Sequence, residues 1–160
     1  MPYSMKVIKR NGSKEDVSFD KVLQRIRKAA RGLQVNPDAL AQQVLSQIID
    51  SVHTAELDEL TAQIAASLTT THPDWGTLAA RIAISNHHKQ TTPSFSIVAR
   101  KLSNQVMPKT GEVSSIIHPD ILELVEKYGE QIDARINYDR DYLFDYFGFK
   151  TLEKSYLLRD

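Results

Sequence analysis

Five basic side chains of the 160-residue chain have the chemistry to bind a polyanion such as a nucleoside triphosphate. They are Lys6, Lys9, Arg10, Lys21 and Lys89. Lysine and arginine form charge-assisted hydrogen bonds to phosphate oxygens, each contributing roughly 1.5 to 3 kcal/mol. The five lie far apart in the sequence, which has no glycine-rich phosphate loop of the Walker type. They form a site only if folding brings them together; the alternative is solvated cations on polar faces.

Two predicted helix starts would add further ligands. Near Ser18 and Phe19, the free backbone N–H groups and the helix dipole favour an anion. At a second helix start, the Thr54 hydroxyl can donate or accept a hydrogen bond. The carboxylate of Asp58, one turn further along, is a natural acceptor for ribose hydroxyls. The alternative is that Thr54 only caps this helix and Asp58 only interacts with its dipole.

Composition excludes several classes of chemistry. The sequence has no cysteine, which removes disulfides, thiolate zinc sites, iron-sulfur ligation and thiol catalysis. None of the five histidines has the i, i+4 spacing of a zinc pair, so no metal site is expected. The formal net charge is zero, and neither a signal peptide nor a membrane-length apolar run is present. We therefore expect a soluble cytoplasmic protein that binds neither nucleic acid nor membrane.

The elements that must position these residues are a hairpin and four helices. Asn11-Gly12 favours a tight turn between strands at residues 6–10 and 14–18. Apolar residues then recur with helical period in four segments. The predicted helices run from Phe19 toward Gly32 with Ser18 as cap, from Asn36-Pro37 to near Val52, from a Thr54 cap toward His72-Pro73, and from Asp74 to Lys89.

A helical extension follows. The pattern predicts helices at 94–106 and 121–136, joined by a linker at 108–115. The fold class is mainly α with a small N-terminal β-hairpin, a four-helix cap at residues 1–92 and an extension at 93–160. Seven aromatic residues crowd the last part: Tyr138, Tyr142, Phe144, Tyr146, Phe147, Phe149 and Tyr156. A free terminus would not expose so much apolar surface, so we expect this tail to pack on protein outside the chain.

Three stretches resemble one family, the class I ribonucleotide reductase large subunit. VIKRNGSKEDVSFDKVLQRI resembles the opening hairpin and first helix of its ATP-cone, and TAELDELTAQIAASLTTTHPDWGTLAARIAISNHHK resembles the rest of the cone. NYDRDYLFDYFGFKTLEKSYLL is similar to the segment that leads into the reductase body, in the eukaryotic-type branch. The resemblance covers nearly the whole chain.

The resemblance implies an allosteric activity site. ATP in the cone, with Mg²⁺, would leave the enzyme active, and dATP would inhibit it by promoting an oligomer of large subunits. Lys9, Arg10 and Lys89 would face phosphates, and Thr54 and Asp58 would lie at the phosphate-ribose side, with Asp58 sensing the sugar. The segment that would wrap the nucleotide comprises Glu15, Asp16, Val17, Ser18, Phe19, Asp20 and Lys21.

The family's reaction makes deoxyribonucleotides for DNA synthesis through a cysteine radical and a redox-active cysteine pair. The resemblance also implies a radical-bearing small subunit as partner. Without cysteine, this chain has no catalytic residue for that reaction. Two other functions stay open. One is an ATP-cone transcriptional regulator, although such proteins carry a four-cysteine zinc ribbon. The other is a helical interaction module that binds no nucleotide, and the aromatic tail favours this alternative.

Overall fold

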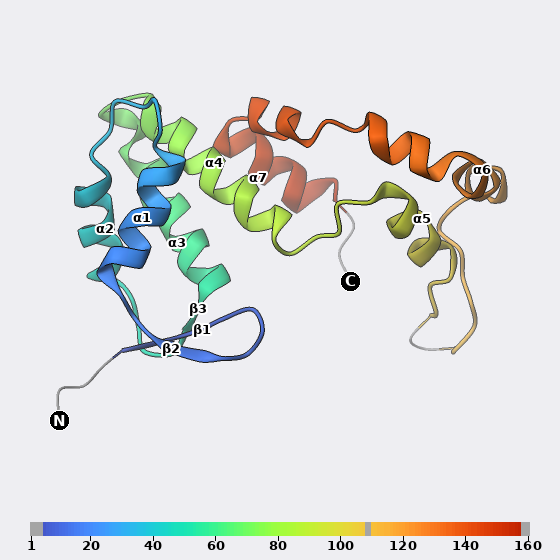
Figure 1. Cartoon of the computed structure of the whole chain (residues 1–160), viewed down its shortest axis with the longest axis horizontal. Helices are drawn as coiled ribbons and strands as arrows, with labels where there is room; N and C mark the ends of the chain where they lie inside the picture. The colour runs from blue at the N-terminus through green and yellow to red at the C-terminus, as the bar shows by residue number, and fades with distance from the viewer. Residues whose placement is uncertain (1–4, 108–109, 158–160) are drawn as a thin grey trace. The chain divides into compact units, whose positions relative to one another are not determined.

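A computed structural model describes residues 5–107 and 110–157 of the chain. The described residues form two compact units, one of residues 5–87 with 141–157 and the other of residues 88–107 with 110–140. The described residues are mainly helical, with one small N-terminal sheet, which confirms the predicted fold class (Figure 1). The elements are β1 (Lys6–Ile8), β2 (Lys14–Asp16), α1 (Phe19–Ala29), α2 (Pro37–Leu45), β3 (Val52–His53), α3 (Thr54–Ser67), η1 (Leu68–Thr70), α4 (Asp74–His88), α5 (Phe95–Ser103), α6 (Pro119–Arg135), η2 (Tyr138–Leu143) and α7 (Tyr146–Ser155).

The predicted hairpin is present and gains a third strand. β1 pairs antiparallel with β2, with Val7 opposite Glu15, and Gly12 turns the chain at a φ of 81°. β3 pairs parallel with β1 on the other side, giving the order β2-β1-β3. The prediction that the second helix reaches Val52 was wrong, because α2 ends at Leu45. Asp50 accepts a hydrogen bond from the Lys6 N–H at 2.8 Å, so the chain after α2 is held along β1 instead.

The helix starts follow local capping. Ser18 caps α1 by accepting a hydrogen bond from the Lys21 N–H at 3.4 Å, as predicted. The cap of α3 is His53, and Thr54 is its first helical residue, so the predicted Thr54 cap was wrong. The reason is that β3 continues through His53, whose N–H donates to the Glu56 side chain at 3.2 Å.

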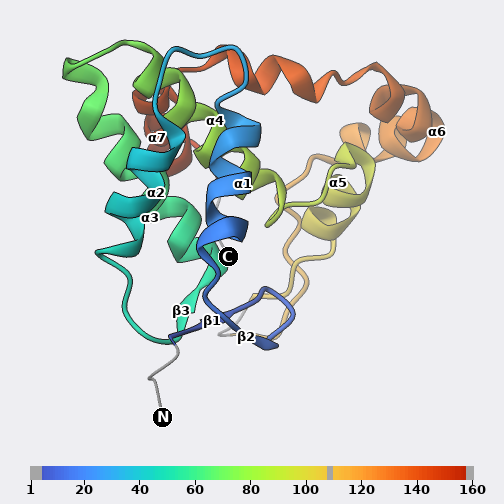
Figure 2. The same ribbon diagram turned by 60° about the vertical axis from the view of Figure 1, so that its left-hand side comes forward.

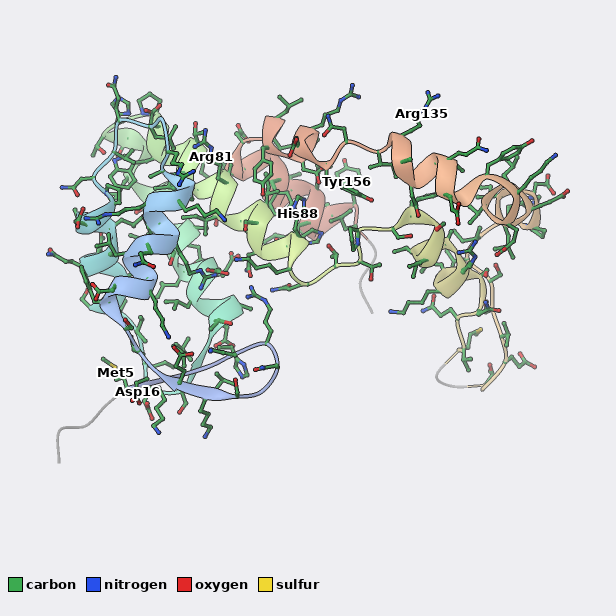
Figure 3. All side chains as sticks on the ribbon, viewed as in Figure 1. Met5, Asp16, Arg81, His88, Arg135 and Tyr156 are labelled. Carbon is green, nitrogen blue, oxygen red and sulfur yellow. The ribbon has the colours of Figure 1, made fainter. Side chains whose placement is uncertain are left out.

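The first unit packs its helices over the sheet. α1, α2 and α3 rise side by side from the strands, and α4 lies beside them (Figures 1 and 2). The largest fully buried side chains of this core are Leu40, Val44, Leu78 and Ile84. From α4, the guanidinium of Arg81 donates to the carbonyl oxygens of Ala29 at 2.8 Å and Arg31 at 2.9 Å, and so holds the C-terminal end of α1 (Figure 3).

The aromatic tail forms a helix that sequence analysis missed. α7 lies beside α4, and Tyr146 and Phe149 are buried in the core of the first unit (Figure 1). The Phe149 ring meets the His87 ring edge-on, with centroids 5.5 Å apart. Phe147 and Tyr156 remain 66% and 73% exposed. Part of the tail therefore packs within the chain, so the prediction that the whole tail packs on protein outside it was wrong for Tyr146 and Phe149 and stays a prediction for the exposed rings.

The second unit is a pair of packed helices, α5 and α6. Ser94 caps α5, as the predicted start implies, but α5 ends at Ser103, before the predicted residue 106. An antiparallel bridge joins Val106 to Val113 of the predicted linker, whose residues 108 and 109 lie outside the described part. α6 begins at Pro119, two residues before the prediction. None of the described helices is long and apolar enough to cross a membrane.

Candidate anion-binding site

The predicted residues Arg10 and Asp58 lie together, although they are 48 positions apart in the sequence. The Arg10 guanidinium donates to Asp58 Oδ2 at 3.2 Å and to Asn86 Oδ1 at 2.5 Å. Arg25 of α1 places its Nη2 against both oxygens of the same carboxylate. The Asp58 side chain is only 9% exposed, so a charge this buried needs such partners. The hairpin, α1, α3 and α4 thus converge at one point.

Two local features position this cluster. β3 leads directly into the start of α3. Asp58 lies one turn after Thr54, on the buried side of this helix. Asn86 lies four residues after the buried Ile82, so it continues the inward face of α4. Its side-chain amide donates to the Ala55 carbonyl at 3.1 Å, which ties the end of α4 to the start of α3.

A second ion-pair cluster lies at the hairpin. Lys9, which follows β1, and Lys21, in the first turn of α1, both pair with Glu15 of β2. The six charged side chains that these ion pairs join comprise four cations, Lys9, Arg10, Lys21 and Arg25, and two carboxylates. This surplus of positive charge, next to the N-terminus of α1, suits an anion with several negative oxygens.

The remaining predicted residues are placed differently. The segment Asp16 to Asp20 runs from the end of β2 into α1, with Asp16 and Asp20 exposed and Ser18 capping the helix. Phe19 is 38% exposed, whereas Val17 packs against the core. Thr54 is half-buried at the start of α3.

Lys6 has an exposed side chain and contributes its backbone N–H to Asp50. Lys89 is an exposed residue of the second unit, so its approach to the hairpin stays a prediction.

Sequence reasoning missed Arg25 and Asn86. A signal for Arg25 was present, because it follows Lys21 by four residues and shares its helix face. The signal for Asn86 was a polar residue that continues the apolar stripe of α4. In the described parts of the chain, no group of three or more His, Asp or Glu side chains is arranged to hold a metal ion.

The structure thus combines a small three-stranded sheet, helices above it and cations gathered at the start of the first helix, an arrangement that suits a module for binding an anionic ligand. The family model described as the ATP cone domain matches residues 5–90, more than half of the chain. The protein therefore belongs to the ATP-cone family. The matched region contains all of the site residues described above, from the hairpin to the end of α4.

Relatives that match beyond the cone are reductase subunits. The chain is 52% identical over 158 residues to the ribonucleoside-diphosphate reductase large subunit of Variola virus, covering 97% of this chain and 20% of the relative. It is 48% identical to the large chain of Neurospora crassa and 49% identical to large chain 2 of Saccharomyces cerevisiae, over 97% of this chain in both. These matches confirm the resemblance, including its eukaryotic-type character. The chain spans about a fifth of these relatives' length.

Proposed function

We propose that this chain is the allosteric activity site of a ribonucleoside-diphosphate reductase large subunit and binds ATP or dATP together with Mg²⁺. The observation that carries the proposal is the convergence of Arg10, Arg25 and Asp58 from three separate elements. A solvated surface would not bring two arginines onto one buried carboxylate, whereas a site that recognises both phosphate and sugar needs a cation for the phosphate and a carboxylate held in place for the sugar.

The cations that now pair with Glu15 are proposed to bind the triphosphate. Lys9 and Lys21 have exposed side chains, so they can exchange the Glu15 carboxylate for phosphate oxygens at little cost. Lys89 follows Asn86 by three positions, about one helical turn, and we assign it to the same phosphates. The segment from Glu15 to Lys21 wraps the nucleotide, with backbone N–H groups of the α1 start as donors.

Asp58 is proposed to distinguish the two nucleotides. ATP and dATP differ by one hydroxyl, so a regulatory site must contact that hydroxyl differently in its two conformations. A carboxylate accepts a hydrogen bond from the 2'-hydroxyl and has no such partner in dATP. A coupling of about 1 to 3 kcal/mol is sufficient for regulation. Thr54, one turn before Asp58, lies close enough along α3 to contribute its hydroxyl on the phosphate-ribose side.

The wider role is proposed from the relatives. The parent protein would be a cytoplasmic enzyme that makes deoxyribonucleotides for DNA synthesis, with other large subunits as partners in a dATP-dependent homo-oligomer and a radical-bearing small subunit. We propose residues 1–92 as the regulatory domain and residues 93–160 as the start of the reductase helical region. α7 then belongs to that region in sequence while it packs on the cone in the structure.

The test is calorimetric titration of the 160-residue chain with ATP and with dATP, each with Mg²⁺, for the unmodified protein and Asp58→Asn. We expect both nucleotides to bind the unmodified chain and Asp58→Asn to change the ratio of the two dissociation constants. Asp38→Asn is the control, because Asp38 is exposed and pairs with Arg27 on the surface. An unchanged ratio in Asp58→Asn would remove this residue from sugar recognition.

A helical interaction module that binds no nucleotide is the second candidate, favoured by the exposed rings of Phe147 and Tyr156. Thermal unfolding separates the two, since a ligand that binds the folded state raises its melting temperature by mass action. Millimolar dATP with Mg²⁺ should raise the midpoint by several degrees. No shift with either nucleotide would favour the interaction module.

A further inference from the structure

We infer that Arg25 is a positioning residue that fixes Asp58 for sugar recognition and thereby sets the discrimination between ATP and dATP. The inference rests on the proposed function and extends it to a residue that is not expected to touch the nucleotide. It starts from an asymmetry between the two arginines that share the Asp58 carboxylate.

The two arginines hold the carboxylate in different ways. Arg25 lies against both Asp58 oxygens, whereas Arg10 reaches one of them, at 3.2 Å. Arg10 also donates to the Asn86 amide oxygen at 2.5 Å, so its guanidinium is divided between two acceptors. The Arg10 contact is therefore the weaker of the two on Asp58 and the one that is more easily exchanged for another anion.

The backbones that carry the two arginines differ as well. Arg10 lies in the turn between β1 and β2, directly after Lys9, where a triphosphate would displace the Glu15 contacts. Arg25 lies inside α1, which is anchored by the buried side chains of Val22, Leu23 and Ile26. A side chain on a packed helix keeps its position while a turn rearranges. Arg10 is thus free to move to a phosphate, and Arg25 is not.

This difference matters because the Asp58 side chain is 9% exposed. If Arg10 moved to the phosphates and Arg25 were absent, the buried Asp58 carboxylate would lose both of its guanidinium contacts beside a polyanion. It would turn away from the nucleotide, and the acceptor for the 2'-hydroxyl would be lost. With Arg25 in place, the carboxylate stays charged and oriented, while the contact given up by Arg10 leaves an oxygen lone pair for the sugar.

The inference predicts that the affinity for phosphate and the discrimination between ATP and dATP can be changed separately. In Arg25→Gln, the ratio of the ATP and dATP dissociation constants should change at least about threefold, while the affinity for inorganic tripolyphosphate changes less than about twofold. Arg10→Gln should weaken tripolyphosphate and both nucleotides. Arg25→Lys should restore the ratio in part, because one ammonium group cannot match the planar guanidinium. Far-UV circular dichroism melts would establish that each variant is folded.

Arg27→Gln is the matched control, since Arg27 is on the same helix and pairs with the exposed Asp38 at 2.8 Å. A double-mutant cycle then tests the route of action: in Arg25→Gln/Asp58→Asn the ratio should equal that of Asp58→Asn alone. Equal losses of ATP and dATP affinity in Arg25→Gln, or no change in either, would overturn the inference. If the unmodified chain binds neither nucleotide, the proposed function itself fails, which is a separate and visible result.

Discussion

Asp58 and Glu59, consecutive residues of α3, bind different partners: Asp58 contacts α1 and the hairpin, and Glu59 contacts α7. Asp58 holds the two arginines of the candidate site, and the Glu59 carboxylate accepts a hydrogen bond from Lys150 Nζ at 2.7 Å. Lys150 belongs to α7, 91 positions later in the sequence. The same helix turn thus connects the candidate nucleotide site with the segment that leads out of the cone.

α4 repeats this arrangement. Asn86 faces the site through its contact with Arg10, and the next residue, His87, faces α7. There His87 packs edge-on against Phe149 and lies 3.9 Å from the Glu153 carboxylate. Any movement of the α3 start or the α4 end on nucleotide binding would therefore act on α7 directly.

Removing the Lys150 cation should destabilise the first unit. Lys150 is 15% exposed and donates to Glu59 and Glu153 at 2.7 Å each. Lys150→Met removes the cation that these two carboxylates share, and we expect a loss of about 1 to 2 kcal/mol, between the values for exposed and buried pairs. Urea unfolding followed by Trp75 fluorescence measures it, because this single tryptophan is buried in the first unit.

Lys154→Met is the control for this change, as Lys154 is an exposed residue of the same helix. It should change the free energy of unfolding by less than about 0.5 kcal/mol. Equal effects of the two substitutions would show that the Glu59 contact adds nothing to the packing of α7.

The same lysine predicts the alkaline limit of stability. Burial by itself lowers the pKa of Lys150, but its hydrogen bonds to Glu153 and Glu59 outweigh this and hold the pKa above its usual 10.5. A raised pKa in the folded state means that the contribution is complete below the unfolded pKa and is lost as the pH rises through the folded value. The melting temperature should fall above about pH 10.5, and more steeply in the unmodified chain than in Lys150→Met. If the melting temperatures of the unmodified chain and of Lys150→Met fell in parallel as the pH rises, Lys150 would not be the cause of this pH dependence.

Local signals were sufficient for the hairpin turn and for most helix starts. Asn11-Gly12, Ser18 and Asn36-Pro37 each act within a few residues, so they can be recognised without knowing the rest of the fold. β3 could not be predicted in this way, because it depends on contacts such as that between Lys6 and Asp50, 44 positions apart. Its two residues carry no strand pattern of their own.

The candidate site was predictable in part for the same reason. Lys9, Arg10 and Asp58 were predicted because their residue types suit phosphate and ribose, and the structure brings Arg10 and Asp58 together. Arg25 and Asn86 were missed, since their role is to hold other side chains and only the fold shows which ones they reach. α7 was missed because its buried rings form an apolar face only against the core of the first unit.

Arg81 should contribute to stability by closing the end of α1. Its guanidinium donates to two carbonyl oxygens, those of Ala29 and Arg31, where the helix leaves acceptors unpaired and the dipole is negative. Arg81→Gln should cost about 1.5 to 3 kcal/mol, the range for hydrogen bonds from a charged donor. The measurement is again urea unfolding by Trp75 fluorescence. Lys28→Gln, an exposed change in the last turn of α1, should cost far less, and a similar cost would show that only general charge matters.

Gly129 of α6 should not tolerate substitution by a larger residue, although it lies inside a helix. Alanine is intrinsically favoured over glycine there by about 1 kcal/mol. A Cβ at this position, however, would lie 2.9 Å from the Ser96 Cβ on α5, so the two helices must move apart. Overpacking of this kind costs about 1 to 3 kcal/mol, and we expect Gly129→Ala to destabilise the second unit on balance. Amide hydrogen exchange of residues 119–135 would report it, with Glu130→Ala as an exposed control. Slower exchange in Gly129→Ala would mean that the gain in helix propensity outweighs the cost of overpacking against Ser96.

Asp133 should make the second unit sensitive to acid. Its carboxylate accepts hydrogen bonds from the hydroxyl groups of Ser94 at 2.6 Å and Ser96 at 2.8 Å, and from the Ser96 N–H at 3.0 Å. These bonds, that from Ser94 first, hold the pKa of Asp133 below its usual 3.8. A lowered pKa in the folded state contributes stability above the unfolded value, and the contribution is lost as the pH falls through the folded one.

Hydrogen exchange of α5 and α6 should therefore accelerate as the pH is lowered below about 4, after correction for the intrinsic exchange rate. Asp133→Asn should be less protected at neutral pH and should show a flatter profile, because an amide keeps one acceptor but has no charge to lose. Glu130→Gln, at an exposed position of α6, is the control. It should keep the steeper pH dependence of hydrogen exchange that the unmodified chain shows. If Asp133→Asn followed the acid profile of the unmodified chain, the link from this carboxylate to the start of α5 would not stabilise the unit.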